Sequence, residues 1–215
     1  MIAQSPRWAR CLAAVVFAGA IVVGIPGIRG AILRAAGWAL VIDEPVASAD
    51  IVVVAVDAGA AGVLEAADLV HNGIATRVAV FADPPDSVDR EFIRRGIPYE
   101  DVAARSSRQL GSLGVTAIEQ IPRAVGTEAE GQVLPAWCDQ HRFRSVVVVS
   151  TPDHSRRLHR VLHRSMKNHQ TRVTVRVTRY SAFDPDRWWE TRGGIRTGII
   201  ELEKLLLDVI FHPIW

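Results

Sequence analysis

The chain has 215 residues, of which 49% are hydrophobic, and a formal net charge of +2. This length accommodates one globular domain of ordinary size plus an appendage, so a single core is expected and a multidomain protein is excluded. The two cysteines exclude a disulfide framework, because Cys11 lies in an apolar segment and Cys138 in a predicted helix. Cysteine usage therefore does not identify the redox compartment.

An uncharged apolar run extends from Cys11 to Ile28. Its length, about 18 residues, is the lower limit for a helix that spans ~30 Å of hydrocarbon. We interpret residues 1–30 as a single-pass membrane anchor. A cleaved signal peptide is the competing interpretation, because Arg7 and Arg10 precede the run and small residues inside it offer a processing site. Retention is favoured, because the run is longer than a typical signal-peptide core and the sequence after it stays apolar.

Positive charges flank this run on both sides, with Arg7 and Arg10 before it and Arg29 and Arg34 after it. The charge bias that orients membrane helices is therefore nearly balanced. The short N-terminal tail favours a cytoplasmic N-terminus, which places the rest of the chain on the periplasmic or extracytoplasmic side of the inner (plasma) membrane. The opposite topology, with the domain facing the cytosol, stays open.

From residue 49 onward, β-rich runs alternate with amphipathic segments, several of which end in glycine. Apolar runs without polar alternation are typical of strands buried on both faces, and glycine is a typical helix stop. The runs predict strands at 49–56, 77–81, 144–150 and 171–178. The segments between them predict helices at 59–73, 87–96, 127–141 and 154–169. We therefore expect an α/β domain at 49–215, Rossmann-like and three-layered with a mostly parallel sheet, joined to the anchor by a linker or amphipathic connector at 31–48.

The C-terminal segment joins Trp188 and Trp189 to a helix that is rich in Ile, Leu and Val. Apolar residues on several sides predict a helix that is either buried or lies at a membrane interface. The helix is too charged to span a membrane, because it contains Glu201, Glu203, Lys204 and Asp208.

Ligands of such a sheet bind beyond the carboxyl ends of the strands, where helices begin. The junction "STPDHSRR" offers the hydroxyls of Ser150 and Thr151 and the unpaired backbone N–H groups of a helix start, which together favour an anion. His154 exchanges a proton near neutral pH, and Arg156 and Arg157 are suited to hold phosphate oxygens. We predict a phosphate-binding site here, with His154 as a candidate acid or base.

The alternative for this junction is purely structural. In it, Asp153 or Ser155 caps the helix and the arginines form its solvated face, with Arg157, Arg160 and Arg164 on one flank. Both interpretations stay open on the residues alone.

Two other strand-to-helix junctions contribute candidates. Thr127 and Glu130 have the spacing of a capping box, but the same helix start can offer a hydroxyl and a carboxylate to a ligand, and Glu130 is a second acid–base candidate. After the first strand, Asp57 and nearby glycines permit close approach of a ligand. The spacing there fits neither a dinucleotide fingerprint nor a P-loop. The sequence predicts no metal site and identifies no cofactor.

The segment between Arg142 and Arg192 contains twelve Lys or Arg residues and four acidic residues, a net charge of +8. An anionic partner is therefore expected. Membrane lipid or a phosphorylated small molecule fits better than nucleic acid, because aromatic residues are few and no nucleic-acid-binding motif is present.

In their order and spacing, these segments resemble the YdcF-like family, which includes the SanA and ElyC envelope proteins. The resemblance covers about Trp38 to Ile210. It is carried by "DEPVASADIVVVAV", "LEAADLVHNGIATRVAVF", "GTEAEG", "VVVSTPDHSRR" and "DRWWETRGGIR". The resemblance implies a Rossmann-like domain, often tethered to the inner membrane, with links to envelope biogenesis and polyprenyl-phosphate carrier metabolism. A nucleotide-like ligand such as S-adenosylmethionine is associated with part of the family.

The chain departs from the family pattern after the first strand. The family usually has a Gly-Gly pair and then an Arg there, whereas this chain has Ala55 to Asp57 and Gly62. The departure implies an altered ligand pocket or a loss of activity.

We expect a membrane-anchored protein of cell-envelope or peptidoglycan biogenesis that binds a phosphorylated envelope metabolite or a polyprenyl-phosphate carrier. A non-enzymatic envelope scaffold and a cytosol-facing binder of a nucleotide or S-adenosylmethionine are the alternatives. The sequence does not decide whether any reaction is catalysed.

Overall fold

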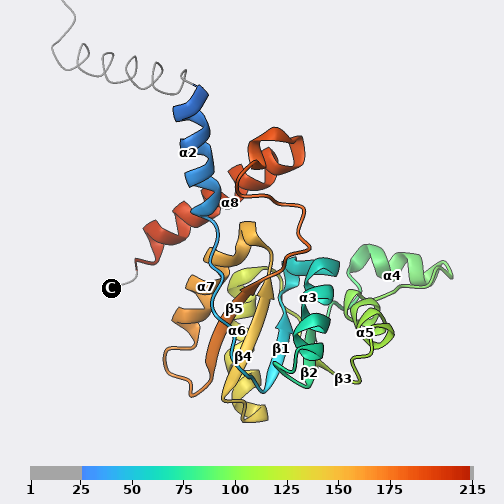
Figure 1. Ribbon diagram of the computed structural model, residues 1–215. Helices are drawn as coiled ribbons and strands as arrows, with labels where there is room; N and C mark the ends of the chain where they lie inside the picture. Colours follow the sequence, from blue (N-terminus) through green and yellow to red (C-terminus); the bar gives the residue numbers. More distant parts are fainter. Residues whose placement is uncertain (1–25, 214–215) are drawn as a thin grey trace, which may run out of the picture.

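The computed structural model describes residues 26–213 (Figure 1). The run Cys11 to Ile28, which we interpret as the anchor, therefore lies almost entirely outside the described residues. Among residues 26–213, no helix is both long enough and apolar enough to cross a membrane.

Five parallel strands form one sheet in the order β3-β2-β1-β4-β5. The strands are β1 (Ile51–Val54), β2 (Arg77–Phe81), β3 (Ala117–Ile121), β4 (Ser145–Ser150) and β5 (Arg172–Val177). From the central strand β1, the sheet extends through β2 to β3 on one side and through β4 to β5 on the other side. The predicted α/β class with a parallel, Rossmann-like sheet is confirmed.

The most apolar strands are at the centre of the sheet. Every residue of β1 is buried, and so are the five residues of β4 after Ser145. The edge strands β3 and β5 contain Glu, Gln, Arg and Thr and are only partly buried. A strand covered on both faces cannot keep polar side chains in water, which explains why β1 and β4 are uninterrupted apolar runs.

Helices cover both faces of the sheet. They are α2 (Pro26–Trp38), α3 (Gly59–His71), α4 (Ser87–Arg94), α5 (Val102–Ser112), α6 (Thr127–His141), α7 (Pro152–Ser165) and α8 (Arg192–Phe211), with short 3-10 turns η1 (Val56–Ala58) and η2 (Trp188–Glu190). The helices α3 and α5 pack on one face, whereas α6 and α7 pack on the other. This arrangement makes the three layers of the domain.

Two elements were not predicted, α5 and β3. The buried positions of α5 are Ala103, Ser106 and Leu110, of which only the last is a large apolar residue. In β3, Glu119 and Gln120 interrupt the apolar pattern because this strand lies at an edge of the sheet. Hydrophobic periodicity is therefore weak in both elements.

The segment 31–48 is not simply a linker. The helix α2 crosses residue 30, and residues after it run beside β5, where the Glu44 backbone N–H donates to the Val175 carbonyl (3.0 Å). The Glu44 carboxylate accepts from the Val175 N–H in return (2.7 Å). The connector is thus held against the edge of the sheet.

A second, smaller apolar cluster joins α2, η2 and α8. Its buried members are Leu40, Phe183 and Trp188. The Trp188 indole N–H donates to the Leu33 carbonyl (2.8 Å), and its ring lies so close to Gly198 that a Cβ there would come within 2.5 Å of it. The paired tryptophans therefore fix α8 and α2 to each other.

Candidate functional site

The strand order reverses between β1 and β4, and open parallel sheets usually bind ligands in a crevice beyond the carboxyl edge near such a reversal. A cavity of about 350 Å³ lies on the β1–β2–β3 side of this crevice. Its lining includes Asp57 and Gly59 after β1, Asp83 after β2, and Arg123 and Gly126 after β3. This position is the usual ligand site of an open parallel sheet.

His154 lies at the centre of a polar cluster beside this cavity. The side chain is buried, and its Nε2 atom lies 2.9 Å from the Thr127 hydroxyl and 3.3 Å from an Asp57 carboxylate oxygen. The Asp57 side chain is half exposed and lines the cavity, so it connects the buried imidazole with the open space. The structure brings together His154, Thr127 and Asp57, which come from three different junctions of the chain.

Arg157 and Glu201 complete the cluster. Arg157 donates one hydrogen bond to the Thr127 hydroxyl (2.6 Å) and two to a Glu201 carboxylate oxygen (3.1 Å each). The same Glu201 oxygen lies 3.3 Å from His154 Nδ1, and Arg157 Nη2 lies 2.9 Å from that nitrogen. The Arg157 guanidinium can only donate hydrogen bonds. In one neutral tautomer of His154, Nδ1 has no proton and accepts from Arg157. In the other tautomer, Nδ1 carries the proton and donates to Glu201.

The electrostatics of the cluster favour an ionised Glu201. Burial raises the pKa of its carboxyl, but hydrogen bonds from His154 and Lys204 and the charge of Arg157 outweigh burial and lower the pKa to about 2. A fixed negative charge beside Nδ1 orients the imidazole and leaves Nε2 facing Thr127 and Asp57. The Thr127 hydroxyl, the His154 imidazole and the Glu201 carboxylate are thus in contact in this order, and these are the kinds of group that acid–base sites use.

Glu130 is buried against the first turn after β1. One of its carboxylate oxygens accepts from the Val56 N–H (2.7 Å), and the other has no hydrogen-bond partner among the described residues. Burial raises the pKa of this carboxyl, against the opposing effects of the Val56 hydrogen bond and of His154. A carboxyl that holds its proton more tightly than usual is suited to acid–base chemistry, as expected for Glu130.

The predicted capping box of Thr127 and Glu130 is wrong. The N-cap of α6 is Gly126, which has a φ of 77°, and no side chain forms a cap hydrogen bond there. Thr127 is the first residue of the helix, and its hydroxyl contacts His154 and Arg157 instead. The positive φ explains the glycine, since other residues adopt that conformation only with strain.

The structural alternative for the "STPDHSRR" junction is also wrong in its choice of cap. The helix α7 begins at Pro152 with Thr151 as the N-cap, and neither Asp153 nor Ser155 occupies that position. The Ser155 hydroxyl is buried, accepts from the Ile42 N–H (2.9 Å) and donates to the Pro152 carbonyl (3.1 Å). Ser155 therefore connects α7 to the segment after α2.

Two of the predicted phosphate ligands are not assembled with His154. The Arg156 guanidinium donates to the carbonyls of Trp38, Ala39 and Val41, and thus binds the end of α2. The Ser150 hydroxyl is buried and donates to the Thr151 carbonyl (3.3 Å). Neither residue lines the cavity. The predicted role of Arg156 in holding phosphate is not supported by its position.

The basic flank of α7 is neither a solvated face nor an open anion site. Arg157 pairs with Glu201, and both Arg160 and Arg164 pair with Asp208. The two acids come from α8, which packs on α7. Acidic residues outside the basic segment therefore neutralise this flank, a pairing that the charge count of the segment did not anticipate.

The helix starts along the carboxyl edge of the sheet differ in their caps. Within residues 26–213, α3, α6 and α7 have no side-chain hydrogen bond at the N-cap. The helices α4 and α8 are capped by Asp86 and Thr191, and α5, whose Val102 and Ser106 line the cavity, is capped by Asp101. Backbone N–H groups without side-chain caps, at the positive ends of helix dipoles, favour an anion in the crevice.

Sequence reasoning missed three residues of the site, Asp83, Arg123 and Glu201. Arg123 lines the cavity with its guanidinium 3.8 Å from the Asp83 carboxylate. It lies in the short loop between β3 and the "GTEAEG" helix start, so recognition of β3 would have identified it as a junction residue. No local sequence signal identifies Glu201, because α8 is distant from α7 in the sequence although the two helices are in contact.

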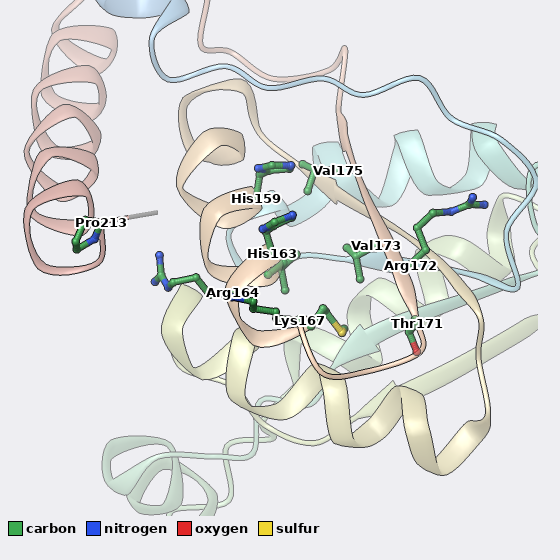
Figure 2. Close-up of a pocket in the computed structure, with 11 residues that line it drawn as sticks. His159, His163, Arg164, Lys167, Thr171, Arg172, Val173, Val175 and Pro213 are labelled. Carbon is green, nitrogen blue, oxygen red and sulfur yellow. The ribbon is translucent and has the colours of Figure 1, made fainter. Parts of the chain in front are cut away.

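A larger cavity of about 640 Å³ lies away from the crevice, between α7 and β5 (Figure 2). His159 and His163 project from α7 on one side, and Val173 and Val175 belong to β5 on the other. Burial lowers the pKa of His159, although Glu44 acts in the opposite direction. The cavity lies beside an edge strand and contains none of the residues that surround His154, so we do not assign it to the functional site.

Other features of the described residues add no site. The Cys138 thiol is buried, and burial raises its pKa to about 12, which disfavours a reactive thiolate. Within residues 26–213, no group of three or more His, Cys, Asp or Glu residues is arranged to hold a metal ion. In comparisons with known proteins, no family model, no curated protein and no solved structure matches the chain.

Proposed function

We propose that this chain is a membrane-anchored protein of the cell envelope whose crevice binds a phosphorylated envelope metabolite or the head group of a polyprenyl-phosphate carrier. The observation that carries the proposal is the cavity at the carboxyl ends of β1, β2 and β3, which is bordered by the starts of α3 and α6 without side-chain caps and has Arg123 in its wall. Backbone N–H groups and a guanidinium are the partners that phosphate oxygens prefer.

In this proposal the phosphate lies near Gly126 and Arg123, at the start of α6. Thr127, His154 and Asp57 border the ligand, and Arg157 positions Thr127 through its hydrogen bond to that hydroxyl. If a reaction takes place, His154 and Glu130 are the acid and base, because one has an orienting carboxylate and the other a raised pKa. The role in envelope biogenesis rests on the apolar run before α2 and on the resemblance to the YdcF-like family.

The test is a thermal-shift measurement on the full chain in detergent, with farnesyl phosphate, inorganic phosphate and farnesol as probes. A ligand at ~100 times its Kd should stabilise the protein by about 2.7 kcal/mol. We expect farnesyl phosphate to stabilise and farnesol not to do so. The substitutions Arg123→Ala and His154→Ala should remove the stabilisation.

Arg77→Ala is the matched control. Arg77 is half exposed and ion-paired like Arg123, but it begins β2 at the opposite edge of the sheet. If Arg77→Ala weakens the response as much as Arg123→Ala does, only general positive charge matters and the assigned site is wrong.

One observation favours a second candidate function, the binding of a nucleotide or S-adenosylmethionine. Asp83 follows β2 and lines the cavity, which is where α/β nucleotide-binding domains place the carboxylate that holds ribose hydroxyls. In the same assay, stabilisation by S-adenosylmethionine that Asp83→Asn removes, without any response to farnesyl phosphate, would establish this function in place of the first.

A further inference from the structure

The helix α8 packs with its polar side inward. The residues that it buries are Gly198, Glu201 and Asp208, and the two carboxylates face the arginines of α7. A helix on the surface of a water-soluble domain normally buries an apolar stripe and exposes charged residues. Apart from Leu202 and Leu205, which are partly buried against the cluster of Leu40, Phe183 and Trp188, α8 reverses this polarity.

The outward side of α8 is rich in large apolar residues. Leu206 is 59% exposed, Ile210 is 58% exposed and Phe211 is 71% exposed. The complete set of exposed apolar side chains is Ile195, Ile199, Ile200, Leu206, Leu207, Val209, Ile210 and Phe211. An apolar surface of this extent on one element marks a contact with a membrane or with another protein.

We propose that the outward face of α8 lies in the surface of a lipid bilayer. The apolar run that ends at Ile28 continues directly into α2, and α2 is fixed to α8 through Trp188. Figure 1 shows α2 and α8 meeting at one end of the domain, above the carboxyl ends of the strands. A bilayer that receives the residues before α2 is therefore next to the end of the domain that carries α8.

The charges on the outward side match an anionic lipid surface. The exposed basic residues of α8 are Arg192, Arg196 and Lys204, of which Lys204 donates to Glu201 (2.7 Å), and Glu203 is the only exposed acid of the helix. Basic side chains beside an apolar stripe bind lipid phosphates while their stems lie along the acyl chains. Arg196 and Glu203 are charged and lie among the exposed apolar residues of α8. The helix therefore rests at the boundary of head groups and acyl chains and does not cross the bilayer.

This position connects the lipid surface with the candidate site. Glu201, which orients His154 and Arg157, belongs to the buried side of the helix whose other side contacts lipid. The inference shares the membrane location with the proposed function, but it does not depend on any ligand of the crevice.

The experiment uses the full chain with Cys11→Ala, so that the buried Cys138 is the only native thiol. Leu206→Cys carries a polarity-sensitive fluorophore. Val88→Cys, on α4 and 58% exposed, is the matched control for a side chain in water. The labelled proteins are reconstituted into vesicles of phosphatidylcholine and phosphatidylglycerol, and emission is quenched either by acyl-chain nitroxide lipids or by aqueous iodide.

We expect the label at 206 to emit at shorter wavelength, to be quenched by the nitroxide lipids and to be protected from iodide, unlike the label at 88. Equal iodide quenching at 206 and 88, in protein that floats with the vesicles, would overturn the inference while leaving the anchor intact. If the label at 206 is self-quenched and added unlabelled protein relieves that quenching, a second copy of the chain covers the outward face of α8. This result would also overturn the inference. Protein that does not float with the vesicles would contradict both the membrane anchor and the lipid contact of α8.

Discussion

Glu201 gives the candidate site its fixed negative charge. Its side chain is nearly buried, and the hydrogen bonds and charges of its neighbours hold its pKa at about 2, well below the usual range of a glutamate. A carboxyl whose pKa is depressed in the folded state stabilises the protein above its unfolded pKa and loses that contribution as the pH falls. A depression of this size corresponds to about 3 kcal/mol at neutral pH.

We therefore expect the free energy of unfolding to fall as the pH decreases from about 5 to about 2. Glu201→Gln should be destabilised by roughly 3–5 kcal/mol at pH 7, because Arg157 loses the partner of a nearly buried pair. The same variant should lose less stability between pH 5 and pH 2. Urea unfolding followed by tryptophan fluorescence measures both effects, and an unchanged acid dependence in Glu201→Gln would show that other carboxyls cause it.

Glu130 is expected to have the opposite pH dependence. Its folded pKa is raised, so the charged form is disfavoured and folding loses stability as the pH rises from the unfolded pKa through the folded one. Glu130→Gln keeps an acceptor for the Val56 N–H and removes the charge. We expect this variant to be more stable than the parent protein at pH 7 and close to it at pH 4. A variant that is less stable at pH 7 would show that the charge of Glu130 is needed in the apo protein.

At the scale of elements, the helix starts divide into those with side-chain caps and those without. Asp101 accepts from the Ala103 N–H (2.8 Å) at the start of α5 and from the Asp83 N–H (3.2 Å) in the cavity wall. The start of α5 thus has a side-chain cap although Val102 and Ser106 line the cavity. The helix starts at the cavity that have no side-chain cap are those of α3 and α6, and their N–H groups are the ones that a ligand would use.

Asp101→Ala should lower the free energy of unfolding by about 0.5–2 kcal/mol, because α5 loses its cap. Thermal unfolding of the variant measures the loss. Asp139→Ala, an exposed acid near the end of α6, is the control and should change stability by less than about 0.5 kcal/mol. Equal losses in the two variants would mean that the cap of α5 contributes nothing specific.

Strong burial made the central elements easy to predict, although the exposed helix α4 and the edge strand β5 were predicted as well. The runs of β1 and β4 are apolar because both faces are covered, and α6 was predicted with its observed bounds, Thr127–His141. The strand β3 lies at an edge and α5 buries small residues, so neither has a strong pattern.

The same reasoning explains the partial prediction of the site. His154, Thr127 and Asp57 follow strands, and the carboxyl ends of parallel strands converge. Glu201 comes from the middle of a helix whose position depends on packing of Trp188 against Gly198. Packing at that range has no local signature in the sequence.

For the whole molecule, the proposed location gives a further prediction. A cytoplasmic N-terminus and an extracytoplasmic domain make a C-terminal alkaline phosphatase fusion active and a C-terminal green fluorescent protein fusion dark. The chain should also stay in the membrane fraction after an alkaline wash. The reverse fusion pattern would place the crevice in the cytosol, where the nucleotide or S-adenosylmethionine candidate becomes the better one.

The pairing of β1 with β4 has a consequence for biosynthesis. Ile51 pairs with Val146, so one edge of the most buried strand stays open until residues 145–150 have been made and, in the proposed topology, exported. An open apolar strand edge is a template for intermolecular pairing, and contacts between distant segments form slowly. The chain is therefore most prone to aggregate after β3 has joined β2 and before β4 arrives, and a pause in translation between Ile121 and Ser145 should be more harmful than one after Val177.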